Sequence, residues 1–229
     1  MDKVSVIIAA AGSASRMNGV PKQLALLCGK PVIAYSMEVF QRIDEISEII
    51  VAAKKEHMDT IRQIAEKYGI TKLTAVTEGG ATRQSSVINA LKCVSKETSL
   101  IAVHDAARPL VSEKHVRSCI HDASVFGGAT LGVPVRDTIK VADDGFVTDT
   151  PDRSRLYIIQ TPQIFMKKYY FEGVNFALDH ELDFTDDCQL AEAVGTKIHI
   201  TLSDYKNIKL TTPEDIDIAE AILGKSDTK

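Results

Sequence analysis

The sequence predicts an α/β fold: a three-layer α/β/α sandwich built on a mostly parallel sheet. Along the 229 residues, short continuous apolar runs of strand length alternate with segments whose apolar residues recur every three or four positions. Strands that alternate with helices of about ten to fifteen residues indicate βαβ units. In such sheets ligands bind beyond the carboxyl ends of the strands, so we expect a site in the loops that follow them.

The first half of the chain opens with a clear strand and a clear helix. Residues 4–10 are continuously apolar, and a helix led by Pro31 follows, with Ile33, Met37 and Phe40 on one face. The other elements predicted in this half are a strand at 48–53, a helix from Met58 to Tyr68 that stops at Gly69, a strand at 72–76, and a helix that carries Val87, Leu91 and Val94.

The second half continues the alternation. A strand is predicted at 100–104, a helix capped by Ser112 comes next, and another strand is predicted at 129–133. Thr212-Pro213 has the form of a capped, Pro-initiated helix start. The length fits one large unit, and we predict a single domain over residues 1–229.

Residues 137–156 interrupt this rhythm. Residues 138–141 and 146–148 flank Asp143-Asp144-Gly145, and an Asp-Gly pair strongly favours a chain reversal. An isolated hairpin is marginally stable in water, so this β-arm either lies on its own domain or packs on a second subunit. We favour the second arrangement, a protruding arm that makes a homodimer.

Composition excludes several classes of protein. The chain has 27 basic and 31 acidic residues, a net charge of −4, which argues against a nucleic-acid binder. No run approaches 18 apolar residues, so no membrane span is expected, and the N-terminus does not resemble a signal peptide. The four cysteines are scattered without a CxxC pair, which favours neither a zinc site nor disulfides and fits a cytoplasmic location.

The loop after the first strand, residues 9–23, is the first candidate for binding chemistry. Its small residues let the backbone of residues 10–12 approach phosphate oxygens, and Arg16 and Lys22 flank the loop with positive charge. The loop matches neither GxxxxGK[ST] nor GxGxxG, so it is not a P-loop and is a weak dinucleotide signal. A plain turn with two solvated cations is the alternative.

Further polar stretches follow later strands. Gly79-Gly80 permits close backbone approach, while the serines that follow could cap a helix or bond a base edge. Asp105 and Arg108 could form a local ion pair or bind sugar hydroxyls and a phosphate; His104 beside them is interpreted as structural. Five cations of this net-acidic chain thus lie near strand ends and predict one polyanion pocket: Arg16, Lys22, Arg108, Arg153 and Lys209.

Read together, these stretches match a known pattern over nearly the whole chain. In order they are AAAG, RM and PKQ in residues 9–23, GG and R..SV in 79–87, HDAARP (104–109), PVRDT (134–138), DR..L (152–156), QTPQ (160–163), TDD (185–187) and NIKLTTPED (207–215). The set resembles the 2-C-methyl-D-erythritol 4-phosphate cytidylyltransferase family, with ribitol-5-phosphate cytidylyltransferase as the alternative. The resemblance implies a Rossmann-like nucleotidyltransferase sheet. It also implies that an alcohol phosphate attacks the α-phosphorus of CTP and releases pyrophosphate.

The resemblance also implies roles for individual residues. Catalysis would rest on Arg16, Lys22 and Lys209. The nucleotide would be bound by Ala10, Ala11, Gly12, Arg16, Lys22, Gly80, Ser86 and Ala106. The methylerythritol phosphate would be bound by Asp105, Arg108, Thr138, Thr185 and Lys209, with Arg153 from a second subunit. Mg²⁺ would be held chiefly by the CTP phosphates, with no metal site formed by the protein.

Three positions depart from the family pattern, and two other classes of protein compete with it. Ala14, Ser15 and Ala81 stand where the family often has Gly, a cation and Asp. An NAD-dependent oxidoreductase would need a glycine fingerprint and an acidic residue at the end of the second strand; the first is absent, and the second strand ends Ala52-Ala53-Lys54. A regulator that binds CTP without catalysis would not need both flanking cations.

Overall fold

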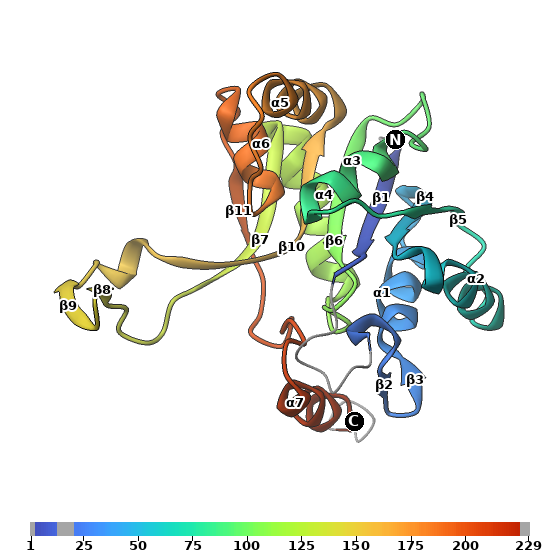
Figure 1. Cartoon of the computed structure of the whole chain (residues 1–229), viewed down its shortest axis with the longest axis horizontal. Helices are drawn as coiled ribbons and strands as arrows, with labels where there is room; N and C mark the ends of the chain where they lie inside the picture. The colour runs from blue at the N-terminus through green and yellow to red at the C-terminus, as the bar shows by residue number, and fades with distance from the viewer. Residues whose placement is uncertain (1–2, 13–20, 225–229) are drawn as a thin grey trace.

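The computed structural model describes residues 3–12 and 21–224, and its centre is a seven-stranded sheet in the order β11-β7-β10-β6-β1-β4-β5 (Figure 1). The strands are β1 (Val4–Ala10), β4 (Ile46–Ala53), β5 (Leu73–Glu78), β6 (Leu100–Asp105), β7 (Gly128–Pro134), β10 (Tyr157–Met166) and β11 (His199–Leu202). All neighbouring pairs are parallel except those of β10, which is antiparallel to both β6 and β7. The predicted mostly parallel sheet is confirmed.

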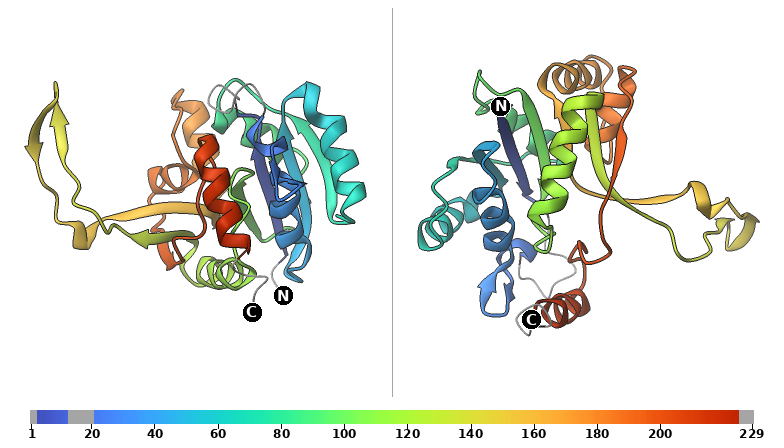
Figure 2. Two further views of the ribbon diagram at one scale, coloured as in Figure 1. Left: turned by 90° about the horizontal axis from the view of Figure 1, so that it is seen from below. Right: turned by 180° about the vertical axis from the view of Figure 1, so that it is seen from behind.

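Helices cover both faces of this sheet (Figure 2). They are α1 (Val32–Gln41), α2 (Met58–Lys67), α3 (Arg83–Leu91), α4 (Glu113–Phe126), α5 (Lys167–Asp179) and α6 (Asp187–Ala193). A further helix, α7 (Pro213–Gly224), packs in a separate apolar cluster with Leu27 and Leu210. Side chains of successive strand residues point to opposite faces, so in β1 Val6 and Ile8 pack with α1, α2 and α4, while Ile7 packs with α3, α5 and α6. The three-layer α/β/α sandwich is confirmed.

Element boundaries follow the local signals closely. β1 has its predicted bounds, Ser112 accepts a hydrogen bond from the His115 N–H as the cap of α4, and Gly69 has a φ of +66° just beyond α2. The sequence did not predict β10, β11, α5 or α6. In β10 the polar Gln160 and Gln163 interrupt the apolar run, although both side chains are buried and hydrogen-bonded.

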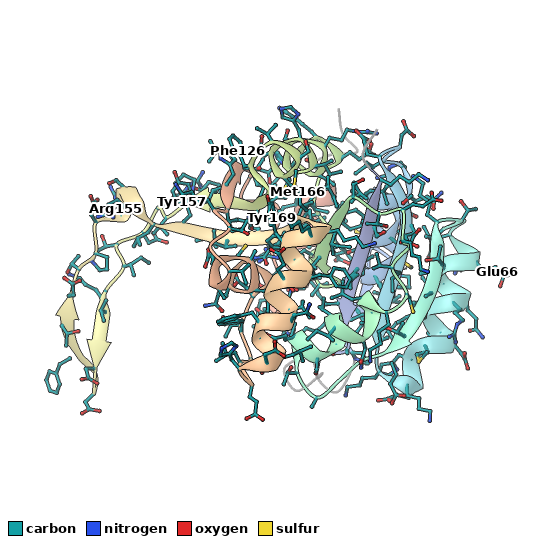
Figure 3. The ribbon with its side chains drawn as sticks, turned by 90° about the horizontal axis from the view of Figure 1, so that it is seen from above. Glu66, Phe126, Arg155, Tyr157, Met166 and Tyr169 are labelled. Carbon is teal, nitrogen blue, oxygen red and sulfur yellow. The ribbon has the colours of Figure 1, made fainter. Side chains whose placement is uncertain are left out.

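The β-arm extends away from the body as an isolated hairpin (Figure 1). Its strands are β8 (Val141–Asp143) and β9 (Phe146–Asp149), joined by Asp144 and Gly145 with φ of 46° and 84°. Positive φ at both central residues is the geometry of a type I′ turn, which Asp-Gly favours. Figure 3 shows Tyr157 where β10 leaves the body and Arg155 further out along the arm.

Two expectations for the arm are corrected. The alternative that the hairpin lies on its own domain is wrong, because Phe146 at its tip is 77% exposed and both strands are exposed throughout. The first strand begins at Val141 and not at residue 138, since the chain from 138 to 140 forms no ladder with the returning strand.

The C-terminal helix fixes the segment that carries Lys209. Ala219 of α7 packs with Leu27 and Leu210, and the Leu210 N–H donates to the Ala107 carbonyl oxygen at 2.8 Å. The Asp215 carboxylate accepts from the backbone N–H of Thr211 and Thr212, which starts the helix. Lys209 is therefore anchored beside the residues that follow β6.

Candidate active site

A cavity of about 630 Å³ lies beyond the carboxyl ends of four neighbouring strands, β6, β1, β4 and β5. The residues that follow these strands line it: Ala11 and Gly12 after β1, Lys54 and Lys55 after β4, Gly79 and Gly80 after β5, and Ala106 and Ala107 after β6. Lys22 and Lys209 add two cations from other segments. The position is where parallel α/β sheets bind ligands.

The glycine pair lets the loop after β5 close tightly against the loop after β1. A Cβ at Gly79 would overlap the Ala11 side chain, and a Cβ at Gly80 would overlap Ser85. The Gly80 N–H donates to the Ser86 hydroxyl at 3.0 Å, and Ser86 donates to the Thr82 carbonyl oxygen at 2.8 Å. Backbone groups and one buried hydroxyl thus form this wall of the cavity.

Helix capping in this loop belongs chiefly to Thr82. Its hydroxyl accepts from the Ser85 N–H, and the Ser85 hydroxyl in turn accepts from the Thr82 N–H, so the two residues form a capping box at the start of α3. Ser85 is therefore occupied by capping, whereas Ser86 lines the cavity.

Asp105, at the end of β6, is shared between two cations. Its Oδ1 accepts from the Arg83 Nε at 3.2 Å, and its Oδ2 lies 2.6 Å from the Lys209 Nζ. Burial by itself raises the pKa of Asp105, but the charges of Arg83 and Lys209 outweigh burial and hold that pKa well below its usual range. The carboxylate is therefore ionised and oriented at neutral pH.

Arg83 contacts a second carboxylate as well. Its Nη1 lies 2.5 Å from the Asp187 Oδ2 at the start of α6. Burial acts to lower the pKa of Arg83, but Asp187 and Asp105 together raise it above its ordinary value. Arg83 thus joins the cavity wall to a buried anion behind it.

Arg108 is held away from the cavity by the backbone. It is 9% exposed, and its guanidinium donates to the Asn207 carbonyl oxygen at 2.8 Å and to that of Ile159 at 3.4 Å. Its Nε lies 4.0 Å from the Asp105 Oδ2. This geometry matches the local ion pair that the sequence left open, and Arg108 does not line the cavity described above.

The predicted site residues thus fall into three groups. The cavity brings together Ala10, Ala11, Gly12, Lys22, Gly80, Ser86, Asp105, Ala106 and Lys209. Within the described part of the chain it is not lined by Arg108, Thr138, Arg153 or Thr185. Arg16 lies outside the described residues.

Thr138, Arg153 and Thr185 lie in other surroundings. Arg153, in the short 3-10 helix η3 (Arg153–Arg155), donates to the Arg136 carbonyl oxygen at 2.8 Å at the base of the β-arm. Thr138 is exposed, in the segment between β7 and β8. Thr185 donates to the Gln189 side chain at 3.1 Å, and the neighbouring Asp186 caps the start of α6.

Several cavity residues were not singled out from the sequence, among them three cations. Lys54 and Lys55 follow β4, and their position directly after a buried strand was the available signal. Arg83 was read only as part of the glycine-pair stretch, because its partner Asp187 is 104 positions away along the chain.

Comparisons with known proteins identify the family of the chain. The model of the 2-C-methyl-D-erythritol 4-phosphate cytidylyltransferase family matches residues 4–225. Proteins of that name from Caldanaerobacter subterraneus subsp. tengcongensis and Clostridium botulinum strain 657 are 43% and 38% identical, over 97% and 98% of this chain and 99% of their own lengths.

Solved structures give the same result. The 4-diphosphocytidyl-2C-methyl-D-erythritol synthase of Anaerococcus prevotii aligns with a TM-score of 0.86 at 33% identity, over 97% of this chain and 96% of that one. The 2-C-methyl-D-erythritol 4-phosphate cytidylyltransferase of Thermus thermophilus aligns at 0.80 with 30% identity, over 97% and 98%. The chain belongs to the 2-C-methyl-D-erythritol 4-phosphate cytidylyltransferase family.

Proposed function

We propose that the cavity beyond β6, β1, β4 and β5 is where this chain carries out the reaction of its family. The chain transfers CMP from CTP to 2-C-methyl-D-erythritol 4-phosphate, giving 4-diphosphocytidyl-2-C-methyl-D-erythritol and pyrophosphate. One observation carries the assignment of the site: the small-residue loop, the glycine pair and the Asp105–Lys209 pair line the same cavity.

The nucleotide end of the cavity is assigned to the loops after β1 and β5. The backbone from Ala10 to Gly12 would bind the triphosphate, and Gly80 with the Ser86 hydroxyl would bind the cytosine edge. Lys22 lines the cavity, and with Arg16 it would stabilise the charge that builds up around the α-phosphate during transfer.

The acceptor end is assigned to Asp105 and Lys209. The acceptor phosphate is already ionised, so one of its oxygens attacks the α-phosphorus without a general base, and the bond to the pyrophosphate oxygen breaks. Lys209 would hold the attacking phosphate and Asp105 the hydroxyls of the acceptor. Arg108, Thr138 and Thr185 remain predicted contacts of the acceptor.

Mg²⁺ is proposed to arrive with the nucleotide. Among the described residues, no group of three or more His, Cys, Asp or Glu side chains is arranged to hold a metal ion, and both oxygens of Asp105 already contact cations. Phosphate oxygens of CTP would therefore supply most of the ligands, and the ion would neutralise part of the triphosphate charge.

The reaction is tested by pyrophosphate release from CTP with each candidate acceptor. We expect turnover with methylerythritol phosphate and little with ribitol 5-phosphate. Faster turnover with ribitol phosphate would assign the chain to the alternative substrate. Release without any acceptor, or binding of CTP with no release, would contradict transfer.

The β-arm is proposed to cross to a two-fold partner. Phe146 and Val147 are 77% and 60% exposed on a hairpin that none of the described residues covers, and a C₂ interface would bury each arm once. Arg153 at the arm base would then reach the partner's acceptor phosphate, which a guanidinium can grip with two hydrogen bonds.

Complementation tests this exchange. Arg153→Ala and Lys22→Ala proteins should each be nearly inactive alone. Refolded together, about half of the dimers are hybrids, and each hybrid has one site with both residues intact, so activity returns to roughly a quarter of wild type. A mixture as inactive as its parents would show that Arg153 does not serve the partner's site.

We also propose that the protein works in the cytoplasm. Cys28, Cys93, Cys119 and Cys188 are all free thiols, which supports a reducing compartment. Within the described part of the chain, the helices are too short or too polar to cross a membrane.

A further inference from the structure

A line of alternating charges runs from the interior of the protein to the cavity. The Tyr170 hydroxyl donates to the Asp187 Oδ1 at 2.6 Å, and the Asp187 Oδ2 contacts the Arg83 Nη1 at 2.5 Å. Arg83 then bonds Asp105 at 3.2 Å, and Asp105 lies 2.6 Å from Lys209. The exposed fraction of the charged side chains changes from 1% at Asp187 to 43% at Lys209.

Asp187, at the inner end of this line, is held on several sides. Besides Tyr170 and Arg83, its backbone N–H donates to the Gln163 side-chain oxygen at 2.9 Å. Tyr170 itself is fully buried and stacks on Phe165 with ring centroids 5.0 Å apart. The Asp187 carboxylate therefore has a fixed position and can hold the Arg83 guanidinium in place.

Asp105, by contrast, depends on its partners for orientation. Arg83 binds one of its oxygens and Lys209 the other, while the Arg108 Nε at 4.0 Å is too far to orient it by a hydrogen bond. The 1%-exposed Asp187 side chain does not itself line the cavity, so it can act on a bound substrate through Arg83.

We propose that Arg83 and Asp187 are positioning residues for the acceptor end of the site. Asp187 fixes Arg83, Arg83 fixes the Asp105 carboxylate, and Asp105 holds the Lys209 ammonium at the cavity wall. This inference rests on the proposed function, in which Asp105 and Lys209 bind the acceptor phosphate. It predicts that Asp187, though buried behind the cavity, affects the acceptor and not the nucleotide.

The test is the steady-state kinetics of Asp187→Asn, with each substrate varied while the other is saturating. A misplacement of order 1 Å can cost about 100-fold, so we expect kcat/KM for methylerythritol phosphate to fall about 10- to 100-fold. The KM for CTP should stay within about twofold of wild type, since uniform binding of the nucleotide is untouched. Tyr170→Phe should give a smaller loss in the same direction, and it carries the test if Asp187→Asn does not fold.

Glu48→Gln is the matched control for a purely structural effect. Glu48 is another buried carboxylate, 7% exposed, which accepts from the Ser95 N–H at 2.8 Å near the start of β4, at the opposite end of the strands. Its substitution should lower the urea midpoint of unfolding without changing either KM or kcat. Acceptor kinetics that fall equally in Glu48→Gln and Asp187→Asn would overturn the inference.

A double-mutant cycle tests the route through Lys209. If Asp187 acts by way of Lys209, adding Asp187→Asn to the Lys209→Ala protein should lower kcat/KM for methylerythritol phosphate by less than about threefold. Fully additive losses in kcat/KM would overturn the inference and leave the proposed function standing. The same holds if Lys209→Ala is impaired while Asp187→Asn has normal acceptor kinetics. Normal acceptor kinetics in Lys209→Ala would overturn the proposed role of Lys209 and the inference with it.

Discussion

His104 makes the stability of this protein depend on pH in a defined range. The imidazole is fully buried at the end of β6 against the edge of Phe40, with ring centroids 5.0 Å apart. Its Nε2 donates to the Arg108 carbonyl oxygen and its Nδ1 accepts from the Thr161 hydroxyl, both at 3.1 Å. Burial lowers the pKa of His104 from 6.5 to about 4, so the native ring is neutral at physiological pH.

The direction of the effect follows from proton linkage. Above about pH 6.5 His104 is neutral in both states, whereas between about pH 6.5 and 4 the unfolded chain binds a proton that the native ring does not. The free energy of unfolding therefore falls as the pH falls. From the two pKa values this amounts to about 2 kcal/mol between pH 7 and 5. Asp105, whose pKa is lowered, contributes stability that is lost only at more acidic pH.

The measurement is urea unfolding of wild type and His104→Gln at pH 7 and pH 5. Glutamine can still donate to the Arg108 carbonyl oxygen but does not titrate. We expect His104→Gln to be less stable at pH 7, yet to lose about 2 kcal/mol less than wild type between the two pH values. An equal loss in both proteins would refute the assignment of a buried neutral imidazole.

Three further predictions concern the cavity and the core. Lys22→Ala should lower kcat about 100-fold or more with a small change in the KM for CTP, as expected for a cation that acts on the transition state; a pure KM effect would contradict this. UTP should release pyrophosphate about 10⁴-fold less efficiently than CTP, because backbone groups at Gly80 would be mismatched to the uracil edge; equal rates would refute base readout. Gly173→Ala should destabilise the fold by about 1–3 kcal/mol in urea unfolding, because the added Cβ would overlap the Leu190 carbonyl oxygen. Gly224→Ala is the control, since a Cβ added there would meet no atom within 4 Å.

The parts of the fold that the sequence predicted are those governed by local rules. β1 and the capped start of α4 follow from an apolar run and a serine, each readable within a few residues. β10 could not be read in this way, because its buried Gln160 and Gln163 are satisfied by partners at Asp204 and Asp187, far along the chain. Burial of a polar side chain depends on those distant partners, and local patterning does not contain them.

The same reasoning separates the parts of the site. Gly80 and Lys209 were found because they lie in recognisable stretches directly after strands or before a capped helix. The link from Asp187 to Arg83 joins α6 to α3 and is visible only in the folded chain. Arg108 has the residue type of a phosphate ligand, but two backbone carbonyl oxygens occupy its guanidinium, a fact that no sequence spacing predicts.

The two ends of the cavity should respond differently to salt. At the β6 end the cations Arg83 and Lys209 are paired with carboxylates, whereas at the β4 end no ion pair within the described residues involves Lys54 or Lys55. An exposed cation beside a triphosphate attracts it over a Debye length, about 10 Å at 0.1 M salt and about 4 Å at 0.5 M. Lys55→Gln should therefore raise the KM for CTP about a few-fold at low salt. At 0.5 M NaCl the difference from wild type should vanish, because salt screens the attraction between exposed charges.

Lys92→Gln is the control for this effect. Lys92 is an exposed cation directly after α3 whose ammonium contacts Asn89, and it does not line the cavity. The variant has the same change in net charge as Lys55→Gln and should show the wild-type KM at every salt concentration. A Lys55→Gln protein that follows the control at low salt would mean that the β4 end does not face the triphosphate.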